Sequence, residues 1–493
     1  RSVLQKMKPF LLSLLAIALG AFSPAAAAAA KPNILFILAD DMGWSDLGCY
    51  GADLHETPRI DQFARESVRF TNAYAMSVCS PTRATLMTGK HAARLHFTIW
   101  AEGAQEGGPK GRKLIEAASI WNLPHTETTI AQRLHDAGYL TALVGKWHLG
   151  DWQHYPETFG FDVNIGGTNW GAPQTHWWPY RGTGTFGKEF RYIPHLEFGK
   201  PGEYLADRLT DEAMKVIDRA GDQPFFVYLA HHSVHTPIEA KAEDVKHFDA
   251  KLQAGGNAMN HKHGVYAAMN KNLDDDVGRI LDHLKERGLD KNTVVIFASD
   301  NGGYVGFDKA SGRDMPVTNN APLRSGKGSL YEGGIRVPLM IRWPGVSKTG
   351  TTCEEPVILT DMFNTLLHVA GLPAEANDGR DITPLLKDPA SKLDRDALFF
   401  HYPHYYHTTT PVSAIRARDW KLLEFFEDNH VELYNLRDDL SEKHDLAKDM
   451  PDKANALRDQ LHAWRDSVGA AMPTPNPDFK GGKPKPQKSQ VTP

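Results

Sequence analysis

Four short apolar runs, each ending abruptly in polar residues, constrain the fold more than any other feature of this 493-residue chain. Residues 33–39, 139–144, 225–230 and 293–298 are mainly apolar and are followed by acidic, glycine or histidine residues. Runs of this kind are typical of strands buried on both faces of a parallel sheet. Between them lie helical patterns, as at residues 277–284, where apolar side chains recur every three or four positions. This alternation predicts an α/β fold with helices on both faces of a large, mostly parallel sheet.

The sequence predicts four segments. Residues 1–30 hold an upstream extension and an export signal, and residues 31–396 form the α/β catalytic domain. Residues 397–471 are expected to form a smaller α+β subdomain with an antiparallel sheet, because alternating aromatic-rich runs precede a final helical pattern there. Residues 472–493 are rich in Pro, Lys and Gly without apolar periodicity, which predicts a disordered tail.

The N-terminus has the layout of a secretory signal peptide. Met7 and Lys8 precede an apolar run over residues 10–22 and an alanine tract that ends at Ala30. A membrane anchor is the alternative, but the run is shorter than the ~20 apolar residues that span a bilayer. No later run has spanning length, so we expect an exported protein without a membrane span. It would be periplasmic, secreted or tethered to the cell surface.

Composition excludes several classes of partner and scaffold. The chain carries 55 Lys and Arg against 60 Asp and Glu, a formal charge of −5. It therefore has no bulk basic field to attract nucleic acid, which is not an expected partner. Three cysteines, Cys49, Cys79 and Cys353, cannot form a disulfide framework. Cys49 and Cys353 could pair after export or stay as free thiols, and the sequence leaves both open.

Residues 79–89, Cys-Ser-Pro-Thr-Arg-Ala-Thr-Leu-Met-Thr-Gly, are the most informative segment. Proline suits the first turn of a helix and glycine its C-cap, so Cys79 is predicted at the amino end of a short helix. The helix dipole stabilises an anion at that end. A lone cysteine is more often a buried structural residue. Four further motifs overturn that interpretation here.

These motifs follow one another in a fixed order along the chain. They are Asp-Asp at 40–41, Gly-Lys-Trp-His at 145–148, Ser-Asp-Asn-Gly at 299–302, and Asn-Ala-Pro-Leu-Arg followed by Lys at 320–327. Together with Cys-x-Pro-x-Arg, they resemble the formylglycine-dependent sulfatases of the alkaline-phosphatase-like superfamily. The resemblance extends over residues 31–447 and implies an exported sulfuric ester hydrolase.

In that family a maturation enzyme oxidises the cysteine to formylglycine, whose hydrate attacks sulfur and forms a covalent sulfo-enzyme. The resemblance implies six catalytic residues: Cys79, Arg83, Lys146, His148, His235 and Lys327. Of these, the two lysines would bind sulfate, Arg83 and His148 would orient and activate the diol, and His235 would protonate the leaving oxygen. It also implies one calcium ion, a hard cation that prefers oxygen ligands. The implied ligands are Asp40, Asp41, Cys79, Asp300 and Asn301.

The substrate is predicted from residues outside these motifs. Aromatic rings stack on sugar faces and histidines bind hydroxyl groups. With the export signal, this favours a sulfated carbohydrate, and galactose or N-acetylgalactosamine sulfate is the first expectation. The candidate contacts are Trp100, Arg112, Trp170, His176, Trp177, His401 and His404. Packing between the two subdomains is the alternative role for each.

Three other functions fit part of the sequence but not all of it. A phosphate-ester or phosphonate hydrolase of the same superfamily shares the sheet but usually needs two metals or more metal-binding histidines. A non-catalytic sulfoglycan-binding protein would have no need of the complete catalytic set. A zinc cluster of His231, His232 and His235 has no glutamate or cysteine partner at the required spacing.

Overall fold

The four apolar runs form adjacent strands of one sheet in the computed structural model, which describes residues 31–255, 259–308 and 311–481. In spatial order they are β9 (Thr293–Ser299), β1 (Asn33–Ala39), β8 (Phe225–Ala230) and β4 (Leu140–Gly145). All four run parallel to one another. Their carboxyl ends therefore meet at one edge of the sheet, where ligands bind in open α/β folds.

The sheet has nine strands and is mixed. β5 (Val163–Ile165) lies outside β4, and the strands beyond β9 are β12 (Arg336–Arg342), β2 (Val68–Tyr74), β13 (Thr351–Cys353) and β14 (Val357–Ile358). β12 is antiparallel to both of its neighbours, whereas the other pairs in this sheet are parallel. The prediction of a large, mostly parallel sheet is confirmed.

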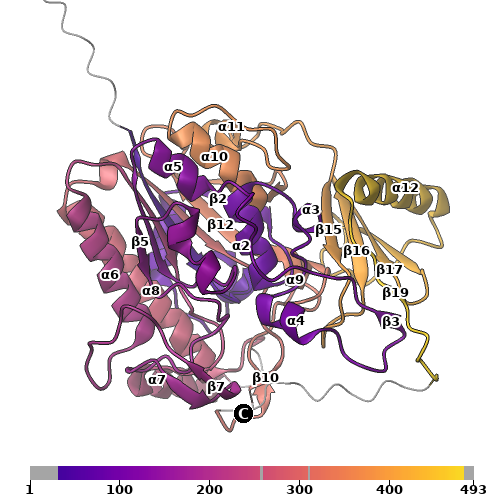
Figure 1. The fold of residues 1–493 in the computed structure, drawn as a ribbon, viewed down its shortest axis with the longest axis horizontal. Helices are drawn as coiled ribbons and strands as arrows, with labels where there is room; N and C mark the ends of the chain where they lie inside the picture. The colour runs from indigo at the N-terminus through magenta and orange to yellow at the C-terminus, as the bar shows by residue number, and fades with distance from the viewer. Residues whose placement is uncertain (1–30, 256–258, 309–310, 482–493) are drawn as a thin grey trace, which may run out of the picture. The chain divides into compact units, whose positions relative to one another are not determined.

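Helices cover both faces of this sheet, as Figure 1 shows for α5 and α10 against α6 and α8. Leu35 and Ile37 of β1 pack in one core, with α1 (Pro58–Arg65), α6 (Leu205–Ala220) and α8 (Gly264–Glu286). Phe36 and Leu38 pack in the other, with α2 (Cys79–Thr88), α5 (Ile130–Asp136) and α10 (Met362–Val369). Successive strand residues point to opposite faces, so a doubly covered strand must be apolar throughout.

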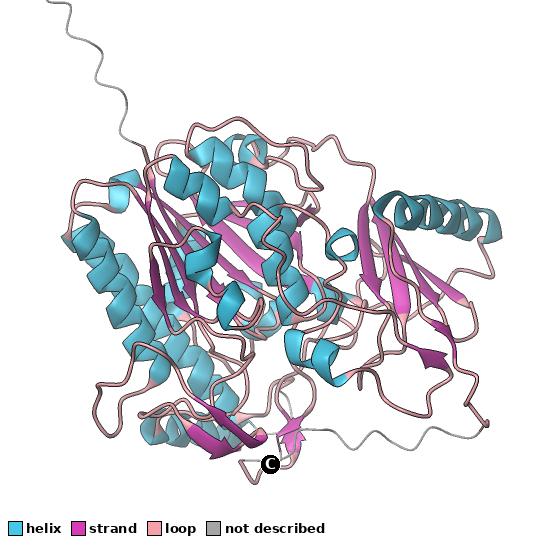
Figure 2. Cartoon of the chain, in the orientation of Figure 1, coloured by secondary structure: helices cyan, strands magenta, loops and turns pink. Residues whose placement is uncertain are grey.

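A second sheet of four antiparallel strands follows in the chain, as predicted. It contains β15 (Leu398–Tyr402), β16 (Val412–Ala417), β17 (Trp420–Phe425) and β18 (Val431–Asn435). One face packs against α12 (Pro451–Val468), which Figure 2 shows along the sheet. The other face packs on residues of the large sheet and its loops, among them Tyr74 and Ile335.

Further helices and short strands connect these layers. They are α3 (Ala92–Leu95), α4 (Ala101–Glu106), α7 (Ala242–Gly255), α9 (Glu332–Ile335), α11 (Thr383–Lys387), β3 (Leu114–Ile115), β6 (Gly182–Gly184), β7 (Gly187–Arg191), β10 (Phe307–Asp308) and β11 (Met315–Pro316). Part of the predicted tail is a strand, because β19 (Thr474–Pro475) pairs with β3. The predicted signal peptide and residues 482–493 lie outside the described residues. Among the residues described, no helix is both long and apolar enough to cross a bilayer.

Candidate active site

The carboxyl edge of the large sheet collects the predicted polar residues. Asp40 and Asp41 directly follow β1, Lys146 follows β4, and Asp300 follows β9. His235 lies in the loop after β8. Parallel strands bring their carboxyl ends together, so residues that are up to 260 positions apart in sequence form one cluster.

Cys79 is the first residue of α2, as the Pro and Gly positions predicted. Gly89 caps the helix with a φ of +68°, a left-handed conformation that glycine adopts without strain. The thiol is buried, with Asp40 Oδ1 3.6 Å and Lys327 Nζ 3.3 Å from its sulfur atom. Burial raises the pKa of Cys79 to about 12, although Lys146 and Lys327 act in the opposite direction. The thiol is therefore protonated at neutral pH.

Two lysines lie near the cysteine, each paired with one of the aspartates. Lys146 Nζ is 2.5 Å from Asp40 Oδ2, and Lys327 Nζ is 2.6 Å from Asp41 Oδ1. Burial alone would raise the pKa of Asp40, but Lys146 and other nearby cations hold it at about 2. Burial lowers the pKa of Lys327, yet Asp41 outweighs this effect and the net shift is well upward. Both carboxylates and both ammonium groups are therefore charged near neutral pH.

Arg83 connects the helix to the third acidic residue. Its Nε and Nη2 atoms donate to Asp300 Oδ2 at 3.0 and 2.8 Å, and Nη1 donates to the carbonyl oxygen of Lys146 at 3.0 Å. The guanidinium is buried. Two hydrogen bonds to one carboxylate oxygen and a third to a carbonyl oxygen fix the orientation of the guanidinium. Arg83 thus locks α2 against the ends of β4 and β9.

The acidic residues form an oxygen-rich set suited to a hard divalent cation. Asp40, Asp41, Cys79 and His235 place one potential ligand atom each within 4.8 Å of one another. Asn301 donates from its amide nitrogen to Asp41 Oδ1 at 2.8 Å, while its buried Oδ1 has no hydrogen-bond partner. An unpaired buried oxygen beside carboxylates is the donor that Ca²⁺ or Mg²⁺ would satisfy. The residues present therefore fit the implied metal.

His235 lies beside the second lysine. Its Nε2 is 3.1 Å from Lys327 Nζ and 3.5 Å from Asp41 Oδ2, and Nδ1 contacts the carbonyl oxygen of Thr236. Burial lowers the pKa of His235, and Asp41 offsets part of this shift. Its side chain keeps 14% of its surface exposed. The predicted acid and the predicted sulfate-binding lysine are thus in direct contact.

His148 has a partner that the sequence did not reveal. Its Nε2 is 2.5 Å from Glu102 Oε2, while its buried Nδ1 has no hydrogen-bond partner. Glu102 Oε1 accepts from the backbone N–H of Gly171 at 2.8 Å. Burial would raise the pKa of Glu102, but His148 and Arg191 hold it well below its usual range. Glu102 lies in α4, 46 positions away, and no sequence motif connects it to His148.

The structure contradicts two of the seven predicted substrate contacts. His401 is buried and contacts Ser413 Oγ and the carbonyl oxygen of Ala471. His404 is buried between Thr98 and Glu116, with both ring nitrogens in hydrogen-bonding contact. Neither ring can reach a ligand, because each holds the second sheet to its neighbours instead.

The other five candidates take different positions. His176 is fully buried behind His235, with Nε2 3.2 Å from its carbonyl oxygen, so it supports the site rather than lining it. The half-buried Trp100 stacks edge-on against Tyr406. Trp170 and Trp177 are half-buried and contact Tyr192 and Tyr204. Arg112 lies over the ring of Tyr405, 5.1 Å from its centroid.

Two open questions from the sequence have structural answers. Among the described residues, no candidate metal group includes His231 or His232, which argues against the zinc cluster. Cys49 and Cys353 are both free thiols.

Comparison with known proteins completes the description of the site. The sulfatase family model matches residues 32–372, and the model for the C-terminal region of N-sulphoglucosamine sulphohydrolase matches residues 326–467. A sulfatase of Formosa agariphila is 32% identical, and the match covers 88% of each chain. The N-acetylgalactosamine-6-sulfatase of Rattus norvegicus is 32% identical over 80% of this chain and 72% of its own. The crystal structure of Ps i-CgsB superposes with a TM-score of 0.72 and 30% identity, covering 88% of this chain and 93% of that one.

Proposed function

Because the chain belongs to the sulfatase family and is a sulfuric ester hydrolase, we propose that it releases sulfate from a sulfated carbohydrate outside the cytoplasm. The proposed site uses a formylglycine made from Cys79 and one calcium ion. One observation carries the proposal: Cys79 lies at a helix start next to Lys327 and Asp40, and Asp40 is paired with Lys146. Such a site combines a nucleophile position, cations for sulfate and ligands for a hard metal.

Formylglycine supplies, when hydrated, one hydroxyl to attack sulfur and a second whose deprotonation expels sulfate from the enzyme. The residues of the chain divide the remaining work. Lys146 and Lys327 hold sulfate oxygens from two sides and neutralise their charge. Arg83 keeps α2, and with it position 79, in a fixed orientation. His148 accepts the proton of the second hydroxyl at its Nδ1 atom, because its Nε2 atom is hydrogen-bonded to Glu102.

A calcium ion would be held by Asp40, Asp41, Asp300, Asn301 and the modified residue at position 79. It would supply Lewis-acid polarisation of the sulfate oxygens and lower the pKa of the attacking hydroxyl. Buried Asn301 Oδ1, without a partner in the protein, supports this ligand set. Calcium is proposed over zinc because the ligands are oxygens rather than a histidine or thiolate cluster.

His235 is the proposed general acid. An alkoxide leaves a sulfate ester slowly unless its oxygen receives a proton. The Nε2 atom of His235 is 3.1 Å from Lys327 Nζ, which supports a position next to the bound sulfate, where the ring would donate once Nε2 carries a proton. Lys327 shares the role of stabilising the leaving oxygen through its positive charge.

The substrate class is supported by the relatives and by the predicted export signal. The relatives include N-acetylgalactosamine-6-sulfatases. The structural neighbour Ps i-CgsB has been solved in complex with k-i-k-neocarrahexaose. A sulfated galactose or N-acetylgalactosamine unit is therefore the proposed target. The layout of residues 7–30 supports export, with the protein periplasmic, secreted or tethered to the surface. A formylglycine-generating enzyme is the proposed maturation partner.

The test is sulfate release from defined saccharides by protein whose residue 79 has been checked by mass spectrometry. Fully converted, calcium-loaded enzyme should release inorganic sulfate from at least one galactose or N-acetylgalactosamine sulfate. Removal of calcium by a chelator should stop the reaction, and added calcium should restore it. A strong preference for the matching phosphate esters would instead favour a phosphate-ester hydrolase.

His235→Ala tests the proton donor. We expect its rate to fall about 100-fold on a sugar sulfate and much less on a nitrophenyl sulfate, because a phenolate leaves without much proton assistance. The measurement is kcat on both substrates. Equal losses would remove His235 from the role of acid.

A further inference from the structure

A large cavity lies directly beside the catalytic lysine. It has a volume of about 720 Å³, within the range of small-molecule binding sites. Its wall includes Tyr406 and Thr408. Thr408 Oγ1 donates to the carbonyl oxygen of Lys327 at 2.8 Å, and the ring of Tyr406 packs so closely on Gly328 that a Cβ there would lie 2.1 Å from it. Two residues of the cavity wall therefore contact the backbone of residues 327 and 328, next to the lysine that binds sulfate in the proposed mechanism.

The second sheet supplies the opposite wall. Phe425 ends β17, Glu427 and Asp428 lie in the turn after it, and Glu432 lies in β18. Arg112, from the segment before β3, completes this side. Apart from Arg112 and Tyr331, the lining comes from the second sheet and its loops, and it places rings and polar side chains on the same surface, as in sites that bind sugars.

Carboxylates outnumber permanent cations in this lining. It holds Glu427, Asp428 and Glu432 against the guanidinium of Arg112, together with the imidazoles of His407 and His430. His430 Nδ1 is 2.5 Å from Asp428 Oδ1, so a protonated His430 would balance that carboxylate. Glu432 is also 3.8 Å from Arg324 and accepts from the hydroxyl of Tyr331 at 2.6 Å, so part of its charge is balanced. Glu427 accepts from the hydroxyl of Tyr405 at 2.6 Å, a neutral donor that leaves its charge in place.

Resting on the proposed function, we propose that this cavity holds the sugar next to the sulfated one and selects an uncharged sugar there. Carboxylates accept hydrogen bonds from sugar hydroxyl groups, which every neutral hexose offers. A sulfate or uronate on the same unit would place an anion against Glu427 and Asp428. Like charges brought together in a partly desolvated site are repelled, which is a common source of specificity. The substrate class is therefore a glycan whose sulfated unit is followed by a neutral sugar.

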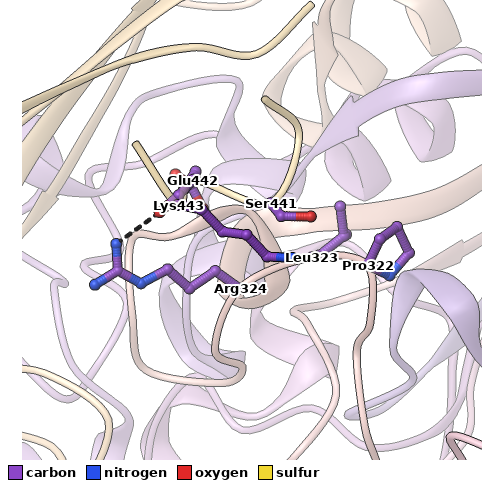
Figure 3. A pocket seen from close by; sticks show the side chains of 6 residues that line it. All are labelled: Pro322, Leu323, Arg324, Ser441, Glu442 and Lys443. Carbon is purple, nitrogen blue, oxygen red and sulfur yellow. Dashed lines mark hydrogen bonds between the residues drawn. The ribbon is translucent and has the colours of Figure 1, made fainter. Parts of the chain in front are cut away.

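A second cavity is also large but lacks the lining on which the proposal depends. It measures about 450 Å³ and lies between residues 322–324 and 441–443. Figure 3 shows Arg324 reaching the backbone of Glu442 at its edge, a hydrogen bond of 2.9 Å. Its lining contains no aromatic side chain and none of the proposed catalytic residues. It carries no proposal.

The experiment compares two disaccharides that share the sulfated unit. In one the neighbouring sugar is neutral, and in the other it carries a second sulfate. Wild-type enzyme should have a kcat/KM about tenfold higher for the neutral neighbour at low salt. This ratio should shrink as salt rises, because ions screen a half-exposed charge. Nitrophenyl sulfate, which has no neighbouring sugar, reports the chemistry alone.

The double variant Glu427→Gln, Asp428→Asn should lower that ratio about threefold or more. Gln keeps a hydrogen-bond acceptor for Tyr405, so the wall should keep its shape. The matched control is Asp419→Asn, Asp438→Asn, which changes the net charge equally at exposed positions of the same sheet outside the cavity. The control should keep the wild-type ratio.

The possible results separate the two claims. If wild-type enzyme treats both disaccharides alike, or if both double variants give the same ratio, the subsite is refuted while the proposed function stands. If wild-type enzyme cleaves nitrophenyl sulfate but no saccharide, both the proposed carbohydrate substrate and the proposed subsite are refuted.

Discussion

Two of the buried clusters of charged residues are built differently. At the carboxyl edge of the large sheet, Lys146 and Lys327 contact Asp40 and Asp41, while Asn301 Oδ1 keeps no partner. Between the two sheets, Lys421 Nζ is 2.8 Å from both Glu332 Oε1 and Glu442 Oε1. The remaining oxygens there accept as well: Glu332 Oε2 from Tyr74 and Arg336, and Glu442 Oε2 from the backbone N–H of Glu332.

The difference supports a ligand at the first cluster. A buried polar atom without a partner costs about 1–3 kcal/mol, and a ligand bound beside it would remove that cost. Asn301 Oδ1 and His148 Nδ1 at the sheet edge are such atoms. In the second cluster Glu442 Oε1 also lacks a hydrogen bond of good geometry, but it is 2.8 Å from the Lys421 ammonium, and the other carboxylate oxygens accept hydrogen bonds. This difference supports the proposal that the first cluster serves chemistry and that the second joins the sheets.

Replacing Cys79 should give the largest functional effect. Cys79→Ala removes the precursor of the nucleophile, so turnover should fall about 10⁴-fold or more. The melting temperature should change little, because a small side chain replaces another. Sulfate release and thermal unfolding measure the two quantities on the same sample. A rate within tenfold of wild type would exclude the mechanism.

Replacing Glu102 should give the next largest loss of rate. Glu102→Gln keeps the size of the side chain but no longer stabilises a protonated His148, so kcat should fall about 10- to 100-fold. If His148 acts in releasing sulfate, sulfated enzyme should accumulate and be visible by intact-protein mass spectrometry. Glu106→Gln, at the exposed end of α4, is the matched control and should behave as wild type. A slow variant without sulfated enzyme would contradict that role for His148.

Breaking the second cluster should cost stability rather than catalysis. Lys421→Met leaves Glu332 and Glu442 buried without their shared cation, which should lower the free energy of unfolding by about 3–5 kcal/mol. Below the unfolding transition, kcat should stay within about threefold of wild type, since no substrate contact is lost. Denaturant unfolding with Lys443→Met as the exposed control measures the difference. A loss of kcat without a loss of stability would reverse the assignment of the two clusters.

The smallest expected effect is a pH dependence of stability from the same cluster. Burial, with Glu332 nearby, raises the pKa of Glu442 to about 7, although Lys421 acts in the opposite direction. The folded state therefore binds more protons than the unfolded state between about pH 4.5 and 7, and stability falls as pH rises through this window. Glu442→Gln lacks this titration. The melting temperature of wild type relative to this variant should decline from pH 5 to pH 8, and a constant difference would refute the assignment.

Much of the fold could be predicted because burial on both faces leaves a direct trace in sequence. β1, β4, β8 and β9 are continuous apolar runs, and their polar ends had to meet. The direction of β12 left no such trace, because an antiparallel strand in a doubly covered sheet has the same apolar pattern. The direction of β12 depends on the path of the loop that precedes it.

The site was predictable where its residues belong to motifs and not where they depend on packing. Cys79 and Lys327 were identified from local sequence, and the structure brings them to 3.3 Å. Glu102 could not be connected to His148, because the position of α4 is set by loops. His401 and His404 misled for another reason. Histidine is chemically suited both to ligand binding and to buried hydrogen bonding, and only the surroundings distinguish the two.

The pairing of β19 with β3 has a practical consequence for handling this protein. Asn476 donates from its backbone N–H to the carbonyl oxygen of Lys113 and from its side chain to that of Arg112. These contacts hold residues 112 and 113 in place, and Arg112 lines the large cavity. Trimming the chain before β19 would remove these two hydrogen bonds to residues 112 and 113 and thereby alter the wall of the proposed sugar subsite.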